Sequence, residues 1–512
     1  MTDDADDAVE SLLNSGKPLA VIEAPAGCGK TYQGARYAQR ALENIGAGRL
    51  LILTHTHAAC SVFADRTRGA GPRVEIRTID ALVSQVATAY HKALDLPPDP
   101  SCFAWQDNGK GFEIIAGRVA ALLRSKPMIA DALARRYPVV VCDEHQDSSA
   151  DQHTIVMSLH GGGAKLRIFG DPCQRLFGGR TDKAIATDRA RWEALKKQGH
   201  FAELAIPHRW KLTAPKLGEW ILKARADLRS GRPIDLTSSL PAGLRVIYAD
   251  NISPTPNAIQ IAKEQRKPVD DLVAAASQIM ILGGNNNTVD ALHAFWSRRI
   301  SIWEGHTREK LAALVDVLGA QSGKPEPIAQ ALLAFVAGVA TGFTPSSHGT
   351  RFVEEVRQAC TRPTKGKPAH IQELGKMILQ DPNHVGVSKA LSRLSQLVET
   401  QTDGFDGINI DYRREFNDAI RLAQFPTALE GYGEIARRRS HARPMPPKRV
   451  ISTIHKAKGL ECDNAIVMAC DKTHFSSTDY ARCKMYVALS RAMKSLTLVV
   501  SRSNCSPLFK VN

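Results

Sequence analysis

The chain has 512 residues, which suffices for about three or four domains and a large buried core. Apolar residues make up 43% and charged residues 23%, and no run of about 18 apolar residues occurs, so a disordered, collagen-like or membrane-spanning chain is excluded. The 67 Lys and Arg residues outnumber the 52 Asp and Glu residues by 15. This net charge of +15 favours a polyanionic partner, although a solvated basic surface is an equal alternative.

The N-terminal segment and the cysteines bear on the compartment. The first residues, MTDDADDAVE, are acidic, the reverse of a secretory or mitochondrial presequence. Ten cysteines are scattered singly, without a CxxC pair or Cys/His ligand spacing. We therefore expect a cytoplasmic protein with free thiols, no membrane association, and no zinc or iron–sulfur cluster.

Apolar strands alternate with helical patterns in the first part of the chain. Strands are predicted at 19–22, 50–53, 138–142 and 166–169, and the stretch 82–136 is mostly helical in pattern. A polar motif follows the carboxyl end of these strands. This order predicts a doubly wound α/β domain whose ligands bind along one edge of a parallel sheet.

The same alternation returns later. Strands are predicted at 279–282, 465–469 and 495–500. Between them, residues 304–444 read as helices with Gly and Pro breaks and no sheet pattern. The basic, proline-rich segment RRRSHARPMPPKR at 437–449 is typical of an inter-domain hinge.

The segment APAGCGKT at 24–31 lies between a predicted strand and a predicted helix. Bare amides in such a loop and the N-terminus of the following helix favour bound phosphate. Lys30 is expected to reach the β- and γ-phosphates, and the hydroxyl of Thr31 to bind Mg²⁺. Ala24 stands where the usual P-loop pattern has its first glycine.

The segment VVVCDEHQD supplies the carboxylates that a phosphate loop requires. We expect Asp143 to bind Mg²⁺, directly or through water. Glu144 is expected to orient and deprotonate the attacking water. ATP and Mg²⁺ are the expected cofactors.

Further motifs follow in order along the chain. GDPCQ comes after the strand at 166–169, and HKAKGLE and YVALSRA lie near the end. Together with the phosphate loop and DEHQD, they resemble the motifs of the UvrD/Rep/PcrA family of superfamily 1 DNA helicases, and the resemblance runs nearly from end to end. The segments that carry it are APAGCGKT (24–31), LTHTHAA (53–59), TIDAL (78–82), DEHQD (143–147), GDPCQ (170–174), LAIPHRW (204–210), ISTIHKAKGLECD (451–463) and YVALSRA (486–492).

The resemblance implies roles for individual residues. Gln174 would sense the γ-phosphate and the attacking water, Arg209 would contact the γ-phosphate, and Arg491 would be an arginine finger. Glu461 would bind the ribose, and His208 stands where the family has an adenine-stacking tyrosine. The implied sets are catalytic Glu144, Gln174, Arg209 and Arg491; nucleotide-binding Ala24, Pro25, Ala26, Gly27, Cys28, Gly29, Lys30, Thr31, His208, Gly459 and Glu461; metal-binding Thr31 and Asp143; and DNA-binding Thr54, His55, Thr56, His57, Thr78, Phe177, Trp210, Thr453 and His455.

The resemblance also implies the fold. It is α/β, with two tandem RecA-like P-loop domains with parallel sheets, each carrying a mainly helical inserted accessory domain. The first RecA-like, ATP-binding domain would comprise 1–82 and 137–205, with a small helical insert at 83–136. The second would comprise 206–303 and 445–512, with a reduced helical insert at 304–444. Because both inserts are smaller than those of the family, translocation is better supported than strong unwinding.

The implied function is ATP-dependent translocation on single-stranded DNA, with 3′→5′ helicase activity on tailed duplexes and hydrolysis in the cleft between the two domains. The alternative is a nucleotide-gated, DNA-binding regulatory subunit with little processive unwinding. Compact UvrD-like proteins of this size resemble helicase subunits of Gabija-type anti-phage systems, whose partner is a separate OLD-type nuclease. A housekeeping repair helicase is a third interpretation.

Other classes fit less well. A kinase or a simple GTPase would not explain Gln174, Arg209 and Arg491 arrayed after the phosphate loop. Composition leaves an RNA substrate open, although the motifs resemble the DNA branch. The chain continues for 21 residues after Arg491 (512 − 491), so no appended nuclease is expected.

The sequence departs from the family pattern at the base and DNA sites. The family usually has a glutamine motif that reads adenine before the phosphate loop, whereas the one side-chain amide here is that of Asn14. His55 replaces a phenylalanine, and Gly179 stands where relatives often carry a stacking aromatic. Trp210 is a candidate to supply that missing surface. For each single histidine or aromatic, core packing is an equal alternative.

Overall fold

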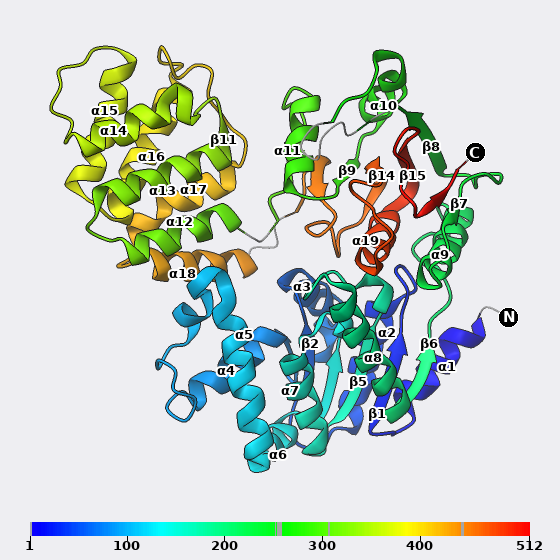
Figure 1. Ribbon diagram of the computed structural model, residues 1–512. Coiled ribbons are helices and arrows are strands. Elements are labelled where there is room, and N and C mark those ends of the chain that lie inside the picture. The colour runs from blue at the N-terminus through cyan, green and yellow to red at the C-terminus, as the bar shows by residue number, and fades with distance from the viewer. Residues whose placement is uncertain (1–2, 251, 253–258, 306–307, 442–444, 512) are drawn as a thin grey trace. The chain divides into compact units, whose positions relative to one another are not determined.

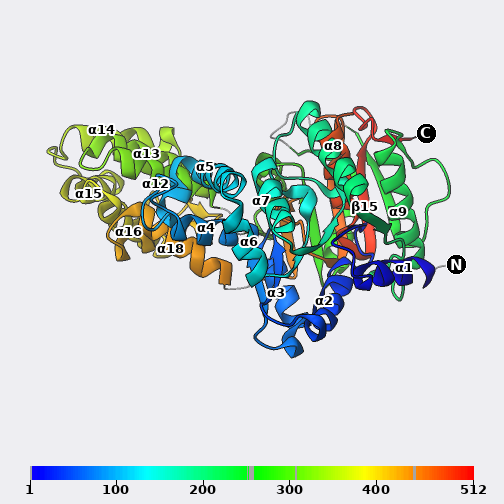
Figure 2. The ribbon, with the colours of Figure 1, turned by 90° about the horizontal axis from the view of Figure 1, so that it is seen from below.

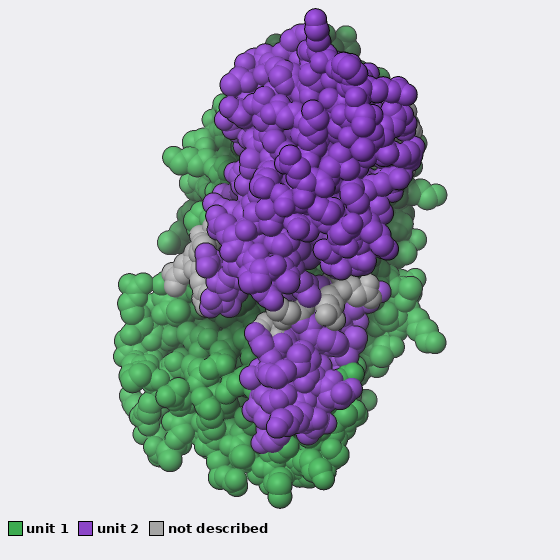
Figure 3. Space-filling model, turned by 90° about the vertical axis from the view of Figure 1, so that its left-hand side faces the viewer, with its two compact units in different colours: residues 1–86, 116–303, 445–512 green, residues 87–115, 304–444 purple. Residues whose placement is uncertain are grey.

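The computed structural model describes residues 3–250, 252, 259–305, 308–441 and 445–511. The chain forms two compact units, one of residues 1–86, 116–303 and 445–512 and the other of residues 87–115 and 304–444 (Figure 3). Within the described ranges, no helix is both long and apolar enough to cross a lipid bilayer.

The larger unit contains a first sheet of six parallel strands in the order β3-β2-β4-β5-β1-β6 (Figure 1). The strands predicted at 19–22, 50–53, 138–142 and 166–169 are confirmed as β1, β2, β4 and β5. The bounds are β1 Leu19–Glu23, β2 Leu50–Thr54, β3 Val74–Thr78, β4 Val139–Cys142, β5 Lys165–Gly170 and β6 His200–Glu203.

Alternate residues of these strands pack on opposite faces of the sheet. Ala20 and Ile22 pack with α1 and α2, whereas Leu19 and Val21 pack with α7 and α8. Figure 2 shows these helix layers on the two sides of the sheet. The helices are α1 Asp3–Asn14, α2 Lys30–Ala41, α3 His57–Arg66, α4 Ile79–Ala89, α6 Pro127–Arg136, α7 Ala150–Gly161 and α8 Asp182–Gln198. The nearly continuous apolar runs in β1, β2 and β4 follow from burial on both faces, and β5 is also buried but contains Arg167.

A second sheet of six parallel strands has the order β10-β13-β9-β14-β15-β8. Strands β9, β14 and β15 confirm the predictions at 279–282, 465–469 and 495–500. The bounds are β8 Leu244–Ala249, β9 Ile279–Gly283, β10 Ser301–Ile302, β13 Arg449–Thr453, β14 Cys462–Cys470 and β15 Ala492–Ser501, with helices α9 Pro215–Arg229, α10 Lys263–Ala275, α11 Asn286–Phe295 and α19 Asp479–Leu489, and a small ladder of β7 Ile234–Asp235 with β16 Phe509–Lys510.

The smaller unit is mainly helical, as predicted for 304–444. Trp105, on α5 (Ser101–Ser125), packs edge-on against Phe112 and Tyr432 with ring centroids 4.8 and 5.2 Å apart. Its other elements are α12 Glu309–Ala320, α13 Pro325–Val339, α14 Thr350–Arg357, α15 Lys367–Gln380, α16 His384–Glu399, α17 Arg413–Arg421 and α18 Ala428–His441, with a short antiparallel ladder of β11 Ala340–Thr341 and β12 Asn409–Ile410. Helix α18 includes the start of the segment predicted as a hinge at 437–449, of which 442–444 lie outside the described residues.

These features confirm the predicted fold class of two tandem RecA-like domains with parallel sheets and helical inserts. The four-part division at the predicted boundaries stays a prediction. What matters for the site is strand order: β1 lies beside β5, and β5 beside β4. The motifs that follow these three strands therefore meet at one edge of the first sheet.

Candidate nucleotide site and nucleic-acid interface

The phosphate loop, residues 24–31, joins β1 to α2. Gly27 and Gly29 adopt positive φ angles of 74° and 85°, which glycine allows without strain. Gly29 lies directly before the first turn of α2, where unpaired amides favour an anion. Ala24 does not adopt a positive φ, so its backbone conformation does not require the glycine of the usual pattern.

Lys30, the first residue of α2, lies against both carboxylates that follow β4. Its Nζ is 3.2 Å from Asp143 Oδ1 and forms a hydrogen bond with Glu144. Burial lowers the pKa of Lys30, and the Asp143 carboxylate opposes this shift. The loop, the cation and the two acids predicted from sequence are therefore brought together.

Asp143 and Thr31 fit the predicted Mg²⁺ site. Asp143 is buried, and within the described ranges the partner of its Oδ1 is the Lys30 ammonium. A carboxylate and a hydroxyl are oxygen ligands of the kind Mg²⁺ prefers. Glu144 adopts a left-handed φ of 54°, a strained conformation for a residue with a side chain and one that clusters at functional sites.

Lys458, between β13 and β14, brings a second cation from the other sheet. Its Nζ bonds Asp147, donates to the carbonyl oxygen of Gln174 at 2.7 Å and lies 3.6 Å from Glu144 Oε2. Sequence reasoning missed Lys458. Its place inside HKAKGLE was the available signal.

Gln174 is held beside this cation. Its side-chain amide donates to Asp171 Oδ2 at 2.9 Å, in the short turn η4 (Pro172–Gln174) that follows β5. Asp171 in turn accepts from Arg225 of α9 at 2.9 Å. Arg225 also binds Glu23 Oε1 at 2.6 Å, so one buried guanidinium joins the ends of β1 and β5.

Arg209 connects the phosphate loop to the second sheet. Its backbone amide donates to the carbonyl oxygen of Gly27 at 3.0 Å. Its guanidinium pairs with Glu461 and donates to the Ser490 carbonyl oxygen at 2.6 Å. The predicted γ-phosphate contact and ribose ligand therefore lie side by side.

Arg491 follows Ser490, but its side chain is buried among backbone carbonyls. It donates to the carbonyl oxygens of Val487 at 2.8 Å and Leu460 at 3.0 Å. Burial lowers the pKa of Arg491 to about 10, and the nearby Arg209 charge adds to the effect. Within the described ranges, no hydrogen bond or ion pair joins the Arg491 side chain to Lys30 or to the two acids, so its role as an arginine finger stays a prediction.

Two aromatic residues fasten the phosphate loop to the second sheet. The Tyr486 hydroxyl, on α19, accepts a hydrogen bond from the Ala26 amide at 2.9 Å. Trp210 donates from its indole nitrogen to the Ala492 carbonyl oxygen at 2.7 Å, and its ring packs against Gly27. Trp210 is 0% exposed, so this structure places it in the core rather than on a DNA-facing surface.

His208, the predicted adenine-stacking residue, lies at the outer end of the same loop. Its Cδ2 is 3.3 Å from the position a Cβ would take on Gly29. Its Nε2 is 2.6 Å from Asp6 Oδ2, on α1. Gly459, the other predicted nucleotide contact in this region, is exposed with a positive φ of 81°.

The predicted DNA contacts differ in exposure. Thr54, Thr78 and Thr453 are buried, and each hydroxyl bonds a nearby group of its own segment. Thr56 is exposed and caps α3, and Phe177 is 43% exposed. The partly exposed members are His55, His57 and His455.

A chain of hydrogen bonds joins His55 to the DEHQD segment. His55 Nε2 is 3.0 Å from Ser148 Oγ, which is 3.2 Å from His145 Nδ1. His145 Nε2 is 2.9 Å from His153 Nδ1. Burial lowers the pKa of each ring, that of His153 to about 4. The rings are therefore neutral at pH 7, and they connect a predicted DNA contact to the segment that carries Asp143 and Glu144.

Tyr480, on α19, is a further aromatic that sequence reasoning missed. Its hydroxyl forms a hydrogen bond with His455 Nε2, and the Arg180 guanidinium lies 5.5 Å from its ring centroid. Phe177 lies under the Lys458 ammonium at 5.4 Å. Aromatic rings paired with cations are the groups that single-stranded nucleic acid uses for stacking.

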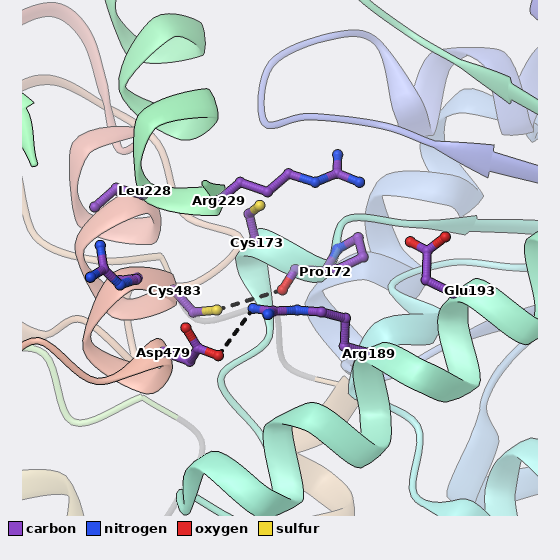
Figure 4. A pocket seen from close by; sticks show the side chains of 9 residues that line it. Pro172, Cys173, Arg189, Glu193, Leu228, Arg229, Asp479 and Cys483 are labelled. Atoms are coloured by element: carbon purple, nitrogen blue, oxygen red, sulfur yellow. Dashed lines mark hydrogen bonds and ion pairs between the residues drawn. The ribbon is translucent and has the colours of Figure 1, made fainter. Parts of the chain in front are cut away.

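A cavity of about 150 Å³ is lined by residues outside the phosphate loop (Figure 4). Elements of both sheets line it: η4 and α8 on one side, α9 and α19 on the other. Arg189 pairs with Asp479 at 3.3 Å, and the Cys483 thiol lies 3.5 Å from the Pro172 carbonyl oxygen. Burial raises the pKa of Cys483 to about 12, so this thiol is unreactive near neutral pH.

A phosphate loop, paired acids and cations that reach in from a second parallel sheet form a site with the features of a P-loop nucleotide-binding protein. Residues 102–184 match the UvrD/REP helicase N-terminal domain, and residues 449–499 match the UvrD-like helicase C-terminal domain. Over these two segments the chain is similar to the UvrD-like superfamily 1 helicases, and this similarity supports a DNA helicase or translocase function. No curated protein matches it closely enough to count as a relative.

Proposed function

We propose that this protein hydrolyses ATP between its two parallel sheets and uses the cycle to move 3′→5′ along single-stranded DNA. The observation that carries the proposal is Lys458. This residue of the second sheet bonds Asp147 and Gln174 of the first, beside Lys30 and Glu144. Binding or hydrolysis of a nucleotide at Lys30 and Glu144 would therefore affect the contacts that Lys458 makes between the two sheets.

The first sheet supplies the groups that bind and activate. Lys30 must leave Asp143 and Glu144 to meet the phosphates, which frees Asp143 to bind Mg²⁺ together with the hydroxyl of Thr31. When bound, Mg²⁺ neutralises charge that develops on the transferred phosphoryl oxygens. Glu144, released from Lys30, then accepts a proton from the attacking water. Gln174, fixed through Asp171, orients that water.

The second sheet and the segment that leads to it supply positive charge from Arg209 and Arg491. Arg209 lies against Gly27 of the phosphate loop and pairs with Glu461, so γ-phosphate and ribose contacts would engage together. Arg491 would act after leaving the carbonyls that hold it. Because hydrolysis then needs groups from both sheets, triphosphate favours one arrangement and diphosphate another.

DNA-stimulated ATP hydrolysis is the direct test. We expect single-stranded DNA to raise the turnover of the wild type, and Lys30→Ala to abolish turnover with and without DNA. Lys197→Ala, an exposed lysine on α8, is the matched control and should match the wild type. Wild-type turnover that ignores DNA across a range of salt concentrations would contradict the proposal.

The direction of translocation and the preference for DNA over RNA are tested with different oligonucleotides. We expect unwinding of 3′-tailed but not 5′-tailed or blunt duplexes. Glu144→Gln should bind ATP and DNA but turn over about a hundredfold more slowly, whereas the exposed Glu219→Gln should not. Equal stimulation by RNA and DNA oligomers would refute the preference for DNA.

The role as a subunit of an anti-phage nuclease complex stays a prediction from the resemblance, as does the cytoplasmic location. Pull-down with the product of the neighbouring gene tests the first of these. A monodisperse monomer with full unwinding activity would count against a regulatory subunit.

A further inference from the structure

Only one of the two carboxylate oxygens of Asp6 has a hydrogen-bond partner among the described residues. Its Oδ2 accepts from His208 Nε2 at 2.6 Å, while Oδ1 is buried and has no hydrogen-bond partner in the part of the chain that is described. A buried acceptor without a donor is costly, and native structures usually fill such a position. A donor that arrives with a ligand would satisfy it.

The position of Asp6 links it to the phosphate loop. Helix α1 packs against α2 and β6, so Asp6 lies beside the segment that leads to His208. The His208 ring reaches Gly29, with its Cδ2 3.3 Å from a Cβ built there. His208 thus connects the loop that takes the phosphates with the free oxygen of Asp6. For a nucleotide whose phosphates bind at Lys30, His208 and Asp6 would then be candidates to contact the base.

The chemistry of Asp6 restricts which base is accepted. A carboxylate accepts hydrogen bonds and donates none. The amino group on C6 of adenine is a donor, whereas guanine and hypoxanthine carry an oxygen acceptor there. Two acceptors facing each other cannot bond, and a site built around one hydrogen bond rejects the analogue that lacks it. The segment before the loop contains no glutamine that could serve instead.

We propose that Asp6 is the residue that selects the base: its Oδ1 accepts a hydrogen bond from the adenine amino group, with His208 beside it. The substrate is then an adenine nucleoside triphosphate, read by a carboxylate rather than by an amide. This inference rests on the proposed ATP hydrolysis at the same loop.

Nucleotide binding without turnover is the test. Glu144→Gln protein is loaded with a ribose-labelled fluorescent ADP, and ATP, GTP, ITP and purine riboside triphosphate compete for the site. Purine riboside triphosphate lacks only the amino group. We expect ATP to bind about tenfold to a hundredfold more tightly than the other three, the loss for one missing hydrogen bond to a charged group. Equal displacement by ATP and purine riboside triphosphate would overturn the proposal.

Variants of Asp6 separate selection from folding of α1. In the same Glu144→Gln background, Asp6→Asn should narrow the ratio of ATP to ITP affinity, because a rotated amide can donate to the ITP oxygen. Asp6→Glu keeps an acceptor and should retain a preference for ATP. Asp7→Asn, an exposed neighbour on α1, should leave the ratio unchanged. An unchanged ratio in Asp6→Asn would also overturn the assignment.

The two proposals fail in different ways. If the protein with Glu144 intact hydrolyses ATP and responds to DNA, but the competition shows no preference for ATP, only the role of Asp6 fails. If the competition shows the preference, Asp6→Asn narrows it and DNA-stimulated turnover is absent, the motor function fails and Asp6 remains the base-reading residue.

Discussion

Replacing Arg225 with methionine tests how the ends of β1 and β5 are held together. Arg225 binds Glu23 Oε1 at 2.6 Å and Asp171 Oδ1 at 2.9 Å, and both carboxylates are 0% exposed. Burial raises the pKa of Glu23, but the charges of Arg225 and Arg229 outweigh burial and hold that pKa below its usual value. Methionine keeps most of the aliphatic volume and removes the charge. Two buried anions are then left with fewer partners.

We expect Arg225→Met to lower the free energy of unfolding by about 3–5 kcal/mol, the usual cost of breaking a buried ion pair from one side. Urea unfolding followed by tryptophan fluorescence measures it, because Trp192 donates to Glu23 at 3.3 Å. The double variant Glu23→Gln, Arg225→Met should lose less than the sum of the single losses. Arg232→Met, at an exposed pair with Asp227, is the control and should change stability by less than about 0.5 kcal/mol.

A loss below about 1 kcal/mol in Arg225→Met, with an unchanged urea dependence, would refute this reasoning. It would mean that Glu23 and Asp171 are neutral or satisfied by their remaining donors. A fully additive double variant would show that the guanidinium and the carboxylate do not interact.

Three further outcomes are expected. Gly27→Ala should weaken nucleotide binding at least about tenfold, because a Cβ there would lie 2.5 Å from the Trp210 ring at a φ of 74°; binding as tight as the wild type would contradict this packing. Tyr480→Ala should weaken single-stranded DNA binding by about 1–3 kcal/mol in an anisotropy titration, while Tyr480→Phe retains most of it; equal loss in both would identify the hydroxyl, not the ring, as the contact. Burial, with the charges of Arg180, Lys484 and Lys458 adding to it and that of Asp147 opposing it, lowers the pKa of His455 to about 4 from 6.5, so the folded state binds fewer protons and stability falls as pH drops from about 6.5 towards 4; thermal unfolding at pH 7 and pH 5 should show a smaller drop in His455→Gln than in the wild type.

In the first sheet, the central strands were predictable from sequence and the edge strands were not. Burial on both faces makes β1, β2 and β4 nearly continuous apolar runs, and β5 is mostly apolar around the buried Arg167; this is the signal that sequence reasoning detects. The edge strands β3 (VEIRT) and β6 (HFAE) are mostly exposed or half-buried and carry no such run. Their pairing comes from the parallel neighbour, which is tertiary information.

In the candidate site, too, some residues were predictable from sequence and others were not. Lys30, Asp143 and Glu144 follow strands with recognisable motifs, and the structure brings them together. Lys458 stood inside a motif but had no assigned role, because its partners lie more than 280 residues away in the chain. Trp210 was misjudged because an aromatic in a polar segment gives no sign of whether it faces solvent or a second sheet.

Trp210 touches the phosphate loop at Gly27 and the start of β15 at Ala492, so a single rigid ring senses both sheets. If β15 moved and carried the indole with it, the packing of the indole against Gly27 of the phosphate loop would loosen. The conformation of the phosphate loop and the distance between the two sheets would therefore change together. A substitution at Trp210, rather than at the acids that perform the chemistry, is therefore the first choice for uncoupling ATP hydrolysis from movement along DNA.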